Sequence, residues 1–186
     1  MTTASEPYHA PYTHCDACGE IVGVTDAPVE CAACRPPDLL ADVREFHERF
    51  GVSYEGKPRT LPESLREFRT KFLEEECREY DEAARETAER LSKLNPSTVT
   101  PLLAEQLDAL VDLVYVALGN AVMQGFDFNE AWRRVHRANM AKRRAAADGS
   151  DSRRGNVADV VKPPGWVAPD HSDLVADHAH LSETAP

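Results

Sequence analysis

The fold is decided by the stretch REFRTKFLEEECREYDEAA, which spans residues 66–84. Apolar side chains in and just before it recur at the three- and four-residue spacing of one helix face: Leu65, Phe68 and Phe72. The next two steps of the same face are Glu76 and Glu79. Two carboxylates therefore stand where a packed helix normally carries apolar side chains.

A second apolar stretch is interrupted in the same way. It reads LDALVDLVYVAL, residues 107–118, and it contains Asp108 and Asp112 in a segment that is apolar almost all round. We expect both aspartates to be at least half buried, and buried carboxylates are costly unless they are paired or bound to a cation. Because each acidic pair has the spacing of one helix face, the sequence predicts a hard-metal site between two packed helices.

The whole pattern predicts an all-α fold with four helices. The helices are expected over residues 37–52, about 61–94, about 100–124 and from Asp127 or Asn129 to about 147. Asn95-Pro96 should end the second helix, and Thr100-Pro101 should begin the third, with threonine as its cap. We expect a zinc-binding module at 1–36, the helical domain at 37–170 and a loose tail at 171–186.

Charge and composition exclude several classes of function. The chain has 186 residues and a net charge of −11, which argues against a broad nucleic-acid or membrane surface. One basic segment, residues 133–154, carries eight Arg and Lys against two Asp and could meet a small polyanion. The sequence shows neither a secretory signal nor an apolar run near the ~20 residues of a membrane span. We therefore expect a cytoplasmic protein with reduced cysteines.

Four cysteines form two C-x2-C pairs, separated by twelve residues: Cys15, Cys18, Cys31 and Cys34. Each pair can present two sulfurs to one tetrahedral ion, so the spacing favours structural Zn²⁺. A module this small cannot bury enough surface to fold unaided, and zinc would fold it. Disulfides and redox-active C-x-x-C pairs are the alternatives. Cys77 is expected to be an inert packing residue.

Ligand chemistry narrows the metal at the carboxylates. Oxygen ligands without histidine favour Mg²⁺ or Mn²⁺. A di-iron bundle would need E-x-x-H pairs on its helices, and the chain has this spacing only from Glu6 to His9. A solvated acidic helix face is the alternative interpretation. No glycine-rich phosphate loop of the Walker A or G-x-G-x-x-G kind is present.

Four ordered motifs carry a family resemblance. They are E-E-x-x-E at 75–79, DALVDLVYV at 108–116, VHRANMAK at 135–142 and VKPPGWVAPD at 161–170. Together they resemble the all-α nucleoside triphosphate pyrophosphohydrolases, the MazG-like and phosphoribosyl-ATP pyrophosphohydrolase-like superfamily, over about residues 39–170. The resemblance implies a four-helix bundle as the protomer, which assembles as a homodimer or homotetramer. It also implies Mg²⁺-dependent hydrolysis of a (deoxy)nucleoside triphosphate to the monophosphate and pyrophosphate.

The resemblance also assigns roles to residues. The metal ligands would be Glu75, Glu76, Glu79, Asp108 and Asp112, and the proton acceptor would be Glu75 or Glu76. The second motif departs from the family pattern, because Ala109 stands where a glutamate is expected; Asp108 and Glu105 are the candidates to replace it. Asn139 and Lys142 are expected near phosphate or sugar. Tyr115 and Trp166 are candidates to contact the nucleotide, with packing as the alternative for each.

Two other functions remain open from the sequence. One is a phosphoribosyl-ATP pyrophosphohydrolase, which is less favoured because that branch is not expected to carry the KPPGW segment at 162–166 or a zinc module. The other is a non-catalytic zinc-ribbon adaptor whose helices only pair with a partner.

Overall fold

A computed structural model of the chain describes residues 13–14, 21–23, 37–93 and 99–178. The chain divides into two compact units, Met1–Asp38 and Leu39–Pro186. In the first unit, β1 (Thr13–His14) pairs antiparallel with β2 (Ile21–Gly23). The four cysteines of the predicted zinc module lie outside the described residues, so zinc binding stays a prediction.

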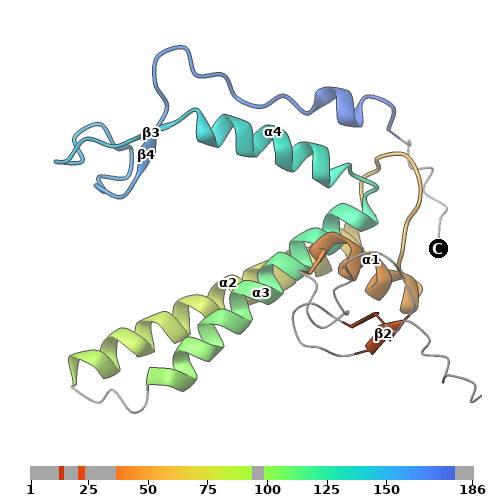
Figure 1. Cartoon of the computed structure of the whole chain (residues 1–186), viewed down its shortest axis with the longest axis horizontal. Coiled ribbons are helices and arrows are strands. Elements are labelled where there is room, and N and C mark those ends of the chain that lie inside the picture. Colours follow the sequence, from red (N-terminus) through yellow and green to blue (C-terminus); the bar gives the residue numbers. More distant parts are fainter. Residues whose placement is uncertain (1–12, 15–20, 24–36, 94–98, 179–186) are drawn as a thin grey trace, which may run out of the picture. The chain divides into compact units, whose positions relative to one another are not determined.

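The second unit is mostly helical, which confirms the predicted fold class (Figure 1). Its helices are α1 (Leu39–Arg49), α2 (Glu63–Ser92), α3 (Val99–Met123) and α4 (Phe128–Met140). Thr100, the predicted cap of the third helix, lies inside α3 instead. No helix in the described part of the chain has the length and apolar character that crossing a membrane requires.

The long helices α2 and α3 form an antiparallel pair that is tied together by polar side chains. Arg69 Nε donates to Asn120 Oδ1 over 2.7 Å, and Gln106 Nε2 donates to Thr87 Oγ1 over 2.7 Å. Arg69 also donates to the carbonyl of Val116. These cross-helix bonds lie far apart along the pair, so they fix how far one helix is shifted along the other.

The helix α1 packs across one end of this pair. The core there consists of two residues from α1 and two from α3, listed by helix: Leu40 and Val43, then Leu118 and Val122. Val43 is completely buried. Tyr115 and Phe128 pack against this cluster, so the first turn of α4 is anchored to it as well. Each fully buried side chain of this kind contributes about 1.5–3 kcal/mol.

The helix α4 begins as predicted but ends earlier. Asp127 Oδ1 accepts a hydrogen bond from the Glu130 backbone N–H over 3.0 Å, which is the expected cap. The helix ends at Met140 rather than near residue 147, which corrects the sequence prediction. The reason is a strand pairing: β3 (Arg143–Arg144) lies antiparallel to β4 (Val160–Val161).

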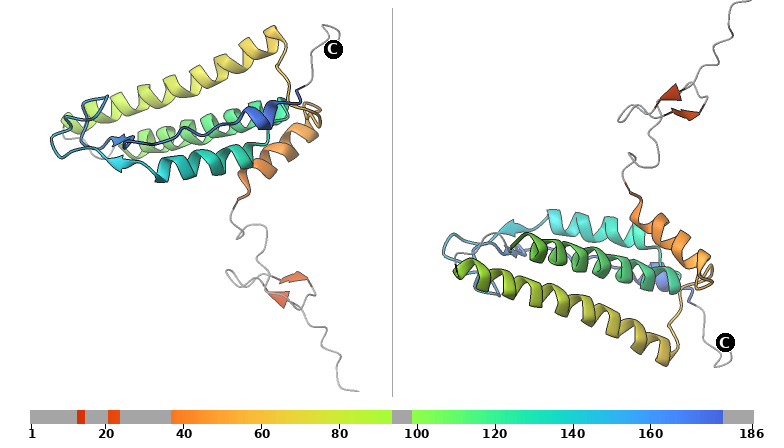
Figure 2. Two further views of the ribbon diagram at one scale, coloured as in Figure 1. Left: turned by 90° about the horizontal axis from the view of Figure 1, so that it is seen from above. Right: turned by 90° about the horizontal axis from the view of Figure 1, so that it is seen from below.

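The chain then runs back along α4, as Figure 1 and Figure 2 show. Trp166 Nε1 donates to the Ala138 carbonyl over 2.7 Å. Further on, a short 3-10 helix, η2 (Ser172–Val175), is tied to α4 through Asp173, and Asp177 pairs with Lys57 at 2.8 Å. This part of the predicted tail is therefore attached to the domain.

Candidate active site

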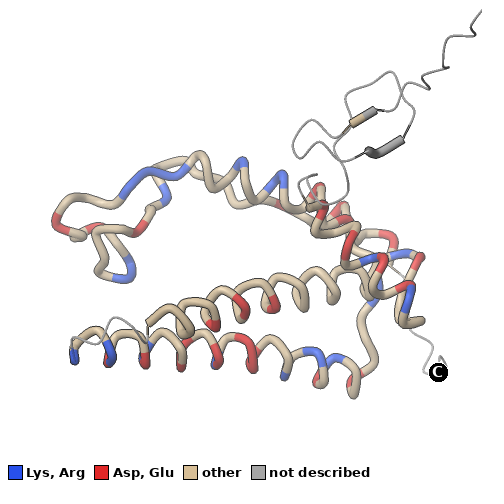
Figure 3. The backbone as a smooth tube through the Cα atoms, turned by 60° about the horizontal axis from the view of Figure 1, so that its bottom comes forward, with Lys and Arg blue, Asp and Glu red and all other residues tan. Residues whose placement is uncertain are grey.

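The antiparallel register of α2 and α3 brings their acidic residues together. Glu76 and Glu79 lie on α2 between Arg69 and Thr87, the residues that bond to α3. On α3, the partners of these two residues are Asn120 and Gln106, and Asp112 lies between them. Asp112 therefore falls at the level of Glu76 and Glu79 on α2. Figure 3 shows acidic positions along both helices, and basic positions on α2, along α4 and in the segment after it.

Glu76 is the carboxylate on which the charges of the other four act. Partial burial, and then the negative charge of nearby carboxylates, raise the pKa of Glu76 above its ordinary value. Those carboxylates, in order of decreasing effect, belong to Glu79, Asp112, Glu75 and Asp108. The four other predicted metal-ligand carboxylates therefore lie close enough to Glu76 for their charges to act on it. Their role as metal ligands stays a prediction.

The aspartates are less buried than predicted. Asp108 and Asp112 are both exposed on α3, and Glu76 alone of the five is partly buried. The expectation of half-buried aspartates is wrong because an almost uniformly apolar helix does not reveal which of its sides is covered. Among the described residues, no three His, Cys, Asp or Glu side chains converge closely enough to hold a metal ion as they stand.

An acidic cleft of about 290 Å³ continues the group along the helices. Its polar lining consists of five carboxylates, three from α2 and two from α3: Glu79, Glu82, Glu86, Glu105 and Asp108. Glu82 and Glu86 were not among the predicted site residues, although they continue the three- and four-residue spacing from Glu79. Arg78 pairs with Glu82, and Arg90 pairs with Glu86, so arginines on the same helix offset part of this charge.

The cleft contains both residues that could replace the missing glutamate of the second motif. Ala109, at the position where an acid was expected, is only 3% exposed and packs inside the pair. Glu105 and Asp108 both line the cleft with Glu79. Both therefore stay candidates for the missing ligand.

Tyr115 lies with α1. Its ring meets that of Phe46 edge-on, with 5.5 Å between centroids, and it packs against the apolar core. Burial, together with the charges of Asp42 and Glu45, raises the pKa of Tyr115. These neighbours correspond to the packing alternative for this residue.

The other predicted substrate contacts gather at the far end of α4. Asn139 lies in its last turn and is exposed. Lys142 Nζ lies 5.8 Å from the centroid of the Trp166 ring, and Lys162 Nζ lies 4.3 Å from it. Trp166 is held by its hydrogen bond to the Ala138 carbonyl, which corresponds to the packing alternative for this residue. Lys162 was not singled out from the sequence.

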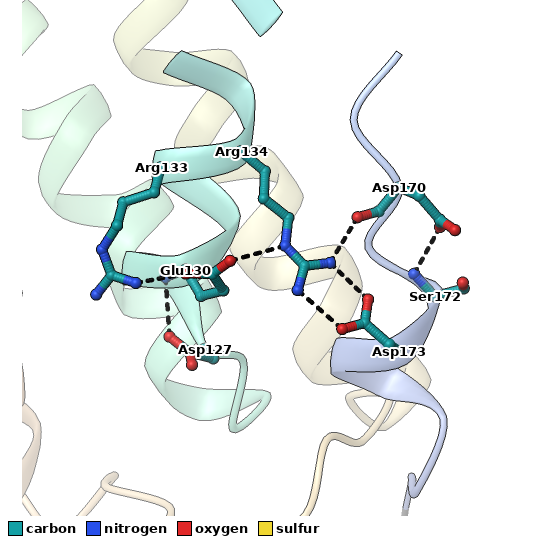
Figure 4. Close-up of polar contacts among 7 residues, drawn as sticks. All are labelled: Asp127, Glu130, Arg133, Arg134, Asp170, Ser172 and Asp173. Atoms are coloured by element: carbon teal, nitrogen blue, oxygen red, sulfur yellow. Dashed lines mark hydrogen bonds and ion pairs between the residues drawn. The ribbon is translucent and has the colours of Figure 1, made fainter. Parts of the chain in front are cut away.

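A charge network joins α4 to η2 (Figure 4). Arg134 donates to both carboxylate oxygens of Asp173, at 2.5 and 2.8 Å, and to Glu130 at 2.9 Å. The Arg134 hydrogen bonds lower the pKa of Asp173 to about 2. Next to this network, a cavity of about 710 Å³ lies between α4 and residues 163–170. The network thus fixes one wall of that cavity.

Comparison with known protein families shows which family the chain belongs to. Residues 43–139, just over half of the chain, match the family described as phosphoribosyl-ATP pyrophosphohydrolase. The chain belongs to the phosphoribosyl-ATP pyrophosphohydrolase family. The match runs from α1 into the last turn of α4, so it includes all the carboxylates that surround Glu76. No curated protein matches the chain significantly.

Membership in the phosphoribosyl-ATP pyrophosphohydrolase family confirms the resemblance at the level of the superfamily. It indicates a hydrolase, a pyrophosphohydrolase of the MazG-like kind, acting in nucleotide metabolism. Lys142, Lys162 and Trp166 lie beyond the matched residues, and so do the four cysteines.

Proposed function

We propose that this protein hydrolyses a (deoxy)nucleoside triphosphate to the monophosphate and pyrophosphate, with Mg²⁺ or Mn²⁺ as cofactor. The observation that carries the proposal is the gathering of four carboxylates around the partly buried Glu76, in a chain of a pyrophosphohydrolase family. A cluster of like charges is unfavourable by itself. A cation bound with a polyphosphate would remove that cost.

The donor set fits a hard divalent cation. The candidate ligands offer only carboxylate oxygens: Glu75, Glu76, Glu79, Asp108 and Asp112. Mg²⁺ usually takes one or two protein carboxylates and completes its shell with water and substrate phosphate. A site in which no three of the described carboxylates converge is compatible with Mg²⁺ held by one or two of them. When bound, the cation would offset phosphate charge and lower the pKa of a water molecule.

Within this proposal, Glu76 is the favoured proton acceptor. Its raised pKa brings it closer to the neutral range in which a general base works well. Glu75, next to it on α2, is the alternative. Asn139 and Lys142 would hold the sugar or phosphates, and the ammonium group of Lys142 would offset charge that develops on phosphoryl oxygens. Attack by water at the α-phosphorus would release pyrophosphate.

The test is a product analysis. The protein is incubated with Mg²⁺ or Mn²⁺ and a panel of nucleoside and deoxynucleoside triphosphates, and the products are separated. We expect monophosphate plus pyrophosphate, with kcat/KM falling by about 100-fold or more in Glu79→Gln and Asp112→Asn. Glu74→Gln is the matched control, since Glu74 is an exposed acid of the same helix outside the Glu76 group. Diphosphate plus phosphate would show attack at a different phosphorus.

Phosphoribosyl-ATP is the second candidate substrate, and the family match over residues 43–139 favours it. It contains the same triphosphate chain, so the carboxylate group could serve either substrate. Including phosphoribosyl-ATP in the panel separates the two, because the preferred substrate has the higher kcat/KM. No turnover of any compound, with unchanged folding and partner binding in the two variants, would favour the non-catalytic adaptor.

We also infer a homodimer or homotetramer. The face of α3 carries a row of exposed apolar side chains: Leu103, Leu107, Leu110, Val111 and Val114. On α4, Trp132 is 62% exposed and Met140 is 72% exposed. Such contiguous apolar surface usually marks an interface, and a second copy supplies a matching apolar row. Light scattering should give a multiple of the 20.6 kDa chain mass, and Leu107→Glu should shift it toward the monomer.

A structural Zn²⁺ at Cys15, Cys18, Cys31 and Cys34 is part of the proposal. Two C-x2-C pairs at this spacing support it. Elemental analysis of protein purified without chelator should find about one zinc per chain. A Cys15→Ser, Cys18→Ser double variant should lose it, and substantially less zinc in the unaltered protein would contradict the assignment.

A further inference from the structure

The strand pairing after α4 brings two lysines to neighbouring positions. Arg143 lies opposite Val161 in the antiparallel pair of β3 and β4. One step outward, Lys142 precedes Arg143 and Lys162 follows Val161, so the two lysines leave the paired strands side by side. Like charges in neighbouring positions across paired strands destabilise the pairing. Their juxtaposition therefore needs a compensating interaction.

Part of that compensation comes from Trp166. Both ammonium groups lie near its ring, with 5.8 Å from Lys142 and 4.3 Å from Lys162 to the centroid. The ring is fixed by the 2.7 Å hydrogen bond from its Nε1 to Ala138. A ring face attracts cations, but it does not replace the acceptors that a lysine ammonium, with three N–H donors, can use.

The described residues supply no carboxylate to either lysine. Two other cations of the hairpin are neutralised by carboxylates: Arg143 pairs with Asp151 at 2.7 Å, and Arg154 pairs with Asp159 at 3.1 Å. Lys142 and Lys162 form no such ion pair among residues 37–93 and 99–178. Two ammonium groups near one fixed ring thus keep their donors available for an anion.

We propose that Lys142 and Lys162 together bind a polyphosphate chain, and that Lys162 is a substrate-positioning residue. Two neighbouring positive charges match two linked phosphate groups better than one, because each ammonium can bond a different phosphate. The identity of the chain as the triphosphate of a substrate, or as released pyrophosphate, rests on the proposed function. The lysine pair itself does not, since it recognises the phosphates and not the base.

Calorimetric titration of the full-length protein tests the site without catalysis. Pyrophosphate is added in the absence of divalent cations to wild type and to three single variants. Lys162→Met keeps a long unbranched side chain and removes the charge; we expect its Kd for pyrophosphate to rise by about tenfold. Lys162→Arg should bind nearly as tightly as wild type. Arg153→Met removes an equally exposed charge from the same hairpin and should change binding little.

Two further titrations identify the ligand. Tripolyphosphate should bind at least as tightly as pyrophosphate, and a nucleoside monophosphate should bind more weakly than both. A monophosphate that binds as tightly as pyrophosphate would contradict recognition of linked phosphates. Equal pyrophosphate affinity of Lys162→Met and wild type, or an equal loss in Arg153→Met, would overturn the lysine pair.

Kinetics separate this inference from the proposed function. If a triphosphate is hydrolysed, Lys162→Met should raise KM by about the factor seen for binding, with a smaller change in kcat. Unchanged KM and unchanged pyrophosphate binding would refute the lysine pair while leaving the activity intact. If no nucleotide is hydrolysed, loss of pyrophosphate binding in Lys162→Met would still support the pair while the proposed activity fails.

Discussion

The imidazole of His47 lies so close to Gly119 that a Cβ atom there would come within 2.8 Å of its Nε2. The same Cβ would meet an Arg69 guanidinium nitrogen at 2.6 Å. Glycine at this point of α3 therefore lets a buried histidine from α1 and an arginine from α2 meet on one helix. The close packing of α1, α2 and α3 at this point therefore requires a residue without a side chain at position 119.

Gly119→Ala should destabilise the protein by about 1–3 kcal/mol, because the added methyl group must displace His47 or Arg69 from a packed site. Urea unfolding measures the free energy change. Ala117→Ser, at an exposed position two residues earlier, should change it by less than about 0.5 kcal/mol. Equal stability of Gly119→Ala and wild type would mean that the site is looser than described.

His47 should make stability depend on pH. It is 2% exposed, and burial, followed by the charge of Arg69, lowers its pKa below the ordinary 6.5. The unfolded chain therefore takes up the proton first, and stability is complete above pH 6.5 and decreases as the pH falls toward the folded-state value. The slope can reach about 1.4 kcal/mol per pH unit.

Urea unfolding at several pH values between 7.5 and 5 measures that slope. His47→Gln should flatten it, whereas His136→Asn should leave it as in wild type, since His136 is exposed. A wild-type slope that survives in His47→Gln would assign the pH dependence to other groups.

Metal affinity can decide whether Glu105 or Asp108 replaces the glutamate that is missing at position 109. Glu105 and Asp108 both line the acidic cleft, but only Asp108 contributes to the raised pKa of Glu76. We therefore expect Asp108→Asn to weaken Mn²⁺ binding by at least about tenfold and Glu105→Gln to weaken it less. Titration with Mn²⁺, followed by electron paramagnetic resonance, measures both. The reverse order would assign the role to Glu105.

The contact between Arg134 and Asp173 should hold η2 against α4. Asp173→Asn removes the charge that both Arg134 nitrogens meet, so residues 172–175 should exchange their amide hydrogens faster. Hydrogen-exchange mass spectrometry measures this, with Asp81→Asn on α2 as the control. The low pKa of Asp173, about 2, predicts that the contact persists well below pH 4 and is lost only as the pH approaches 2.

Local signals in the sequence were reliable guides to this fold. The four helices follow from apolar spacing, and the Asp127 cap follows from a residue type whose partner is three positions away. The end of α4 was missed because a basic run reads as helix, whereas the pairing of Arg143 with Val161 depends on a distant segment. Strand pairing at that separation leaves no periodic trace in so short a strand.

The candidate site, too, was predicted from local spacing only in part. Spacing on α2 and α3 placed Glu76 and four other carboxylates in one site. The charges of those four raise the pKa of Glu76, while metal binding by the five stays a prediction. Periodicity could not show that Asp112 is exposed, because burial depends on what covers each side of α3. Lys162 was not predicted as a site residue, because it becomes a neighbour of Lys142 only when β3 and β4 pair.

The hydrogen bond from Trp166 to Ala138 has a consequence for the order of events during synthesis. The carbonyl of Ala138 is among the last four of α4, which have no partner within the helix. Its donor lies 28 residues further along the chain. While the chain is being made, the Ala138 carbonyl therefore lacks this donor until residue 166 has been added, whereas the carbonyls of Arg137 and Asn139 can already accept from the nearby N–H groups of Ala141 and Lys142.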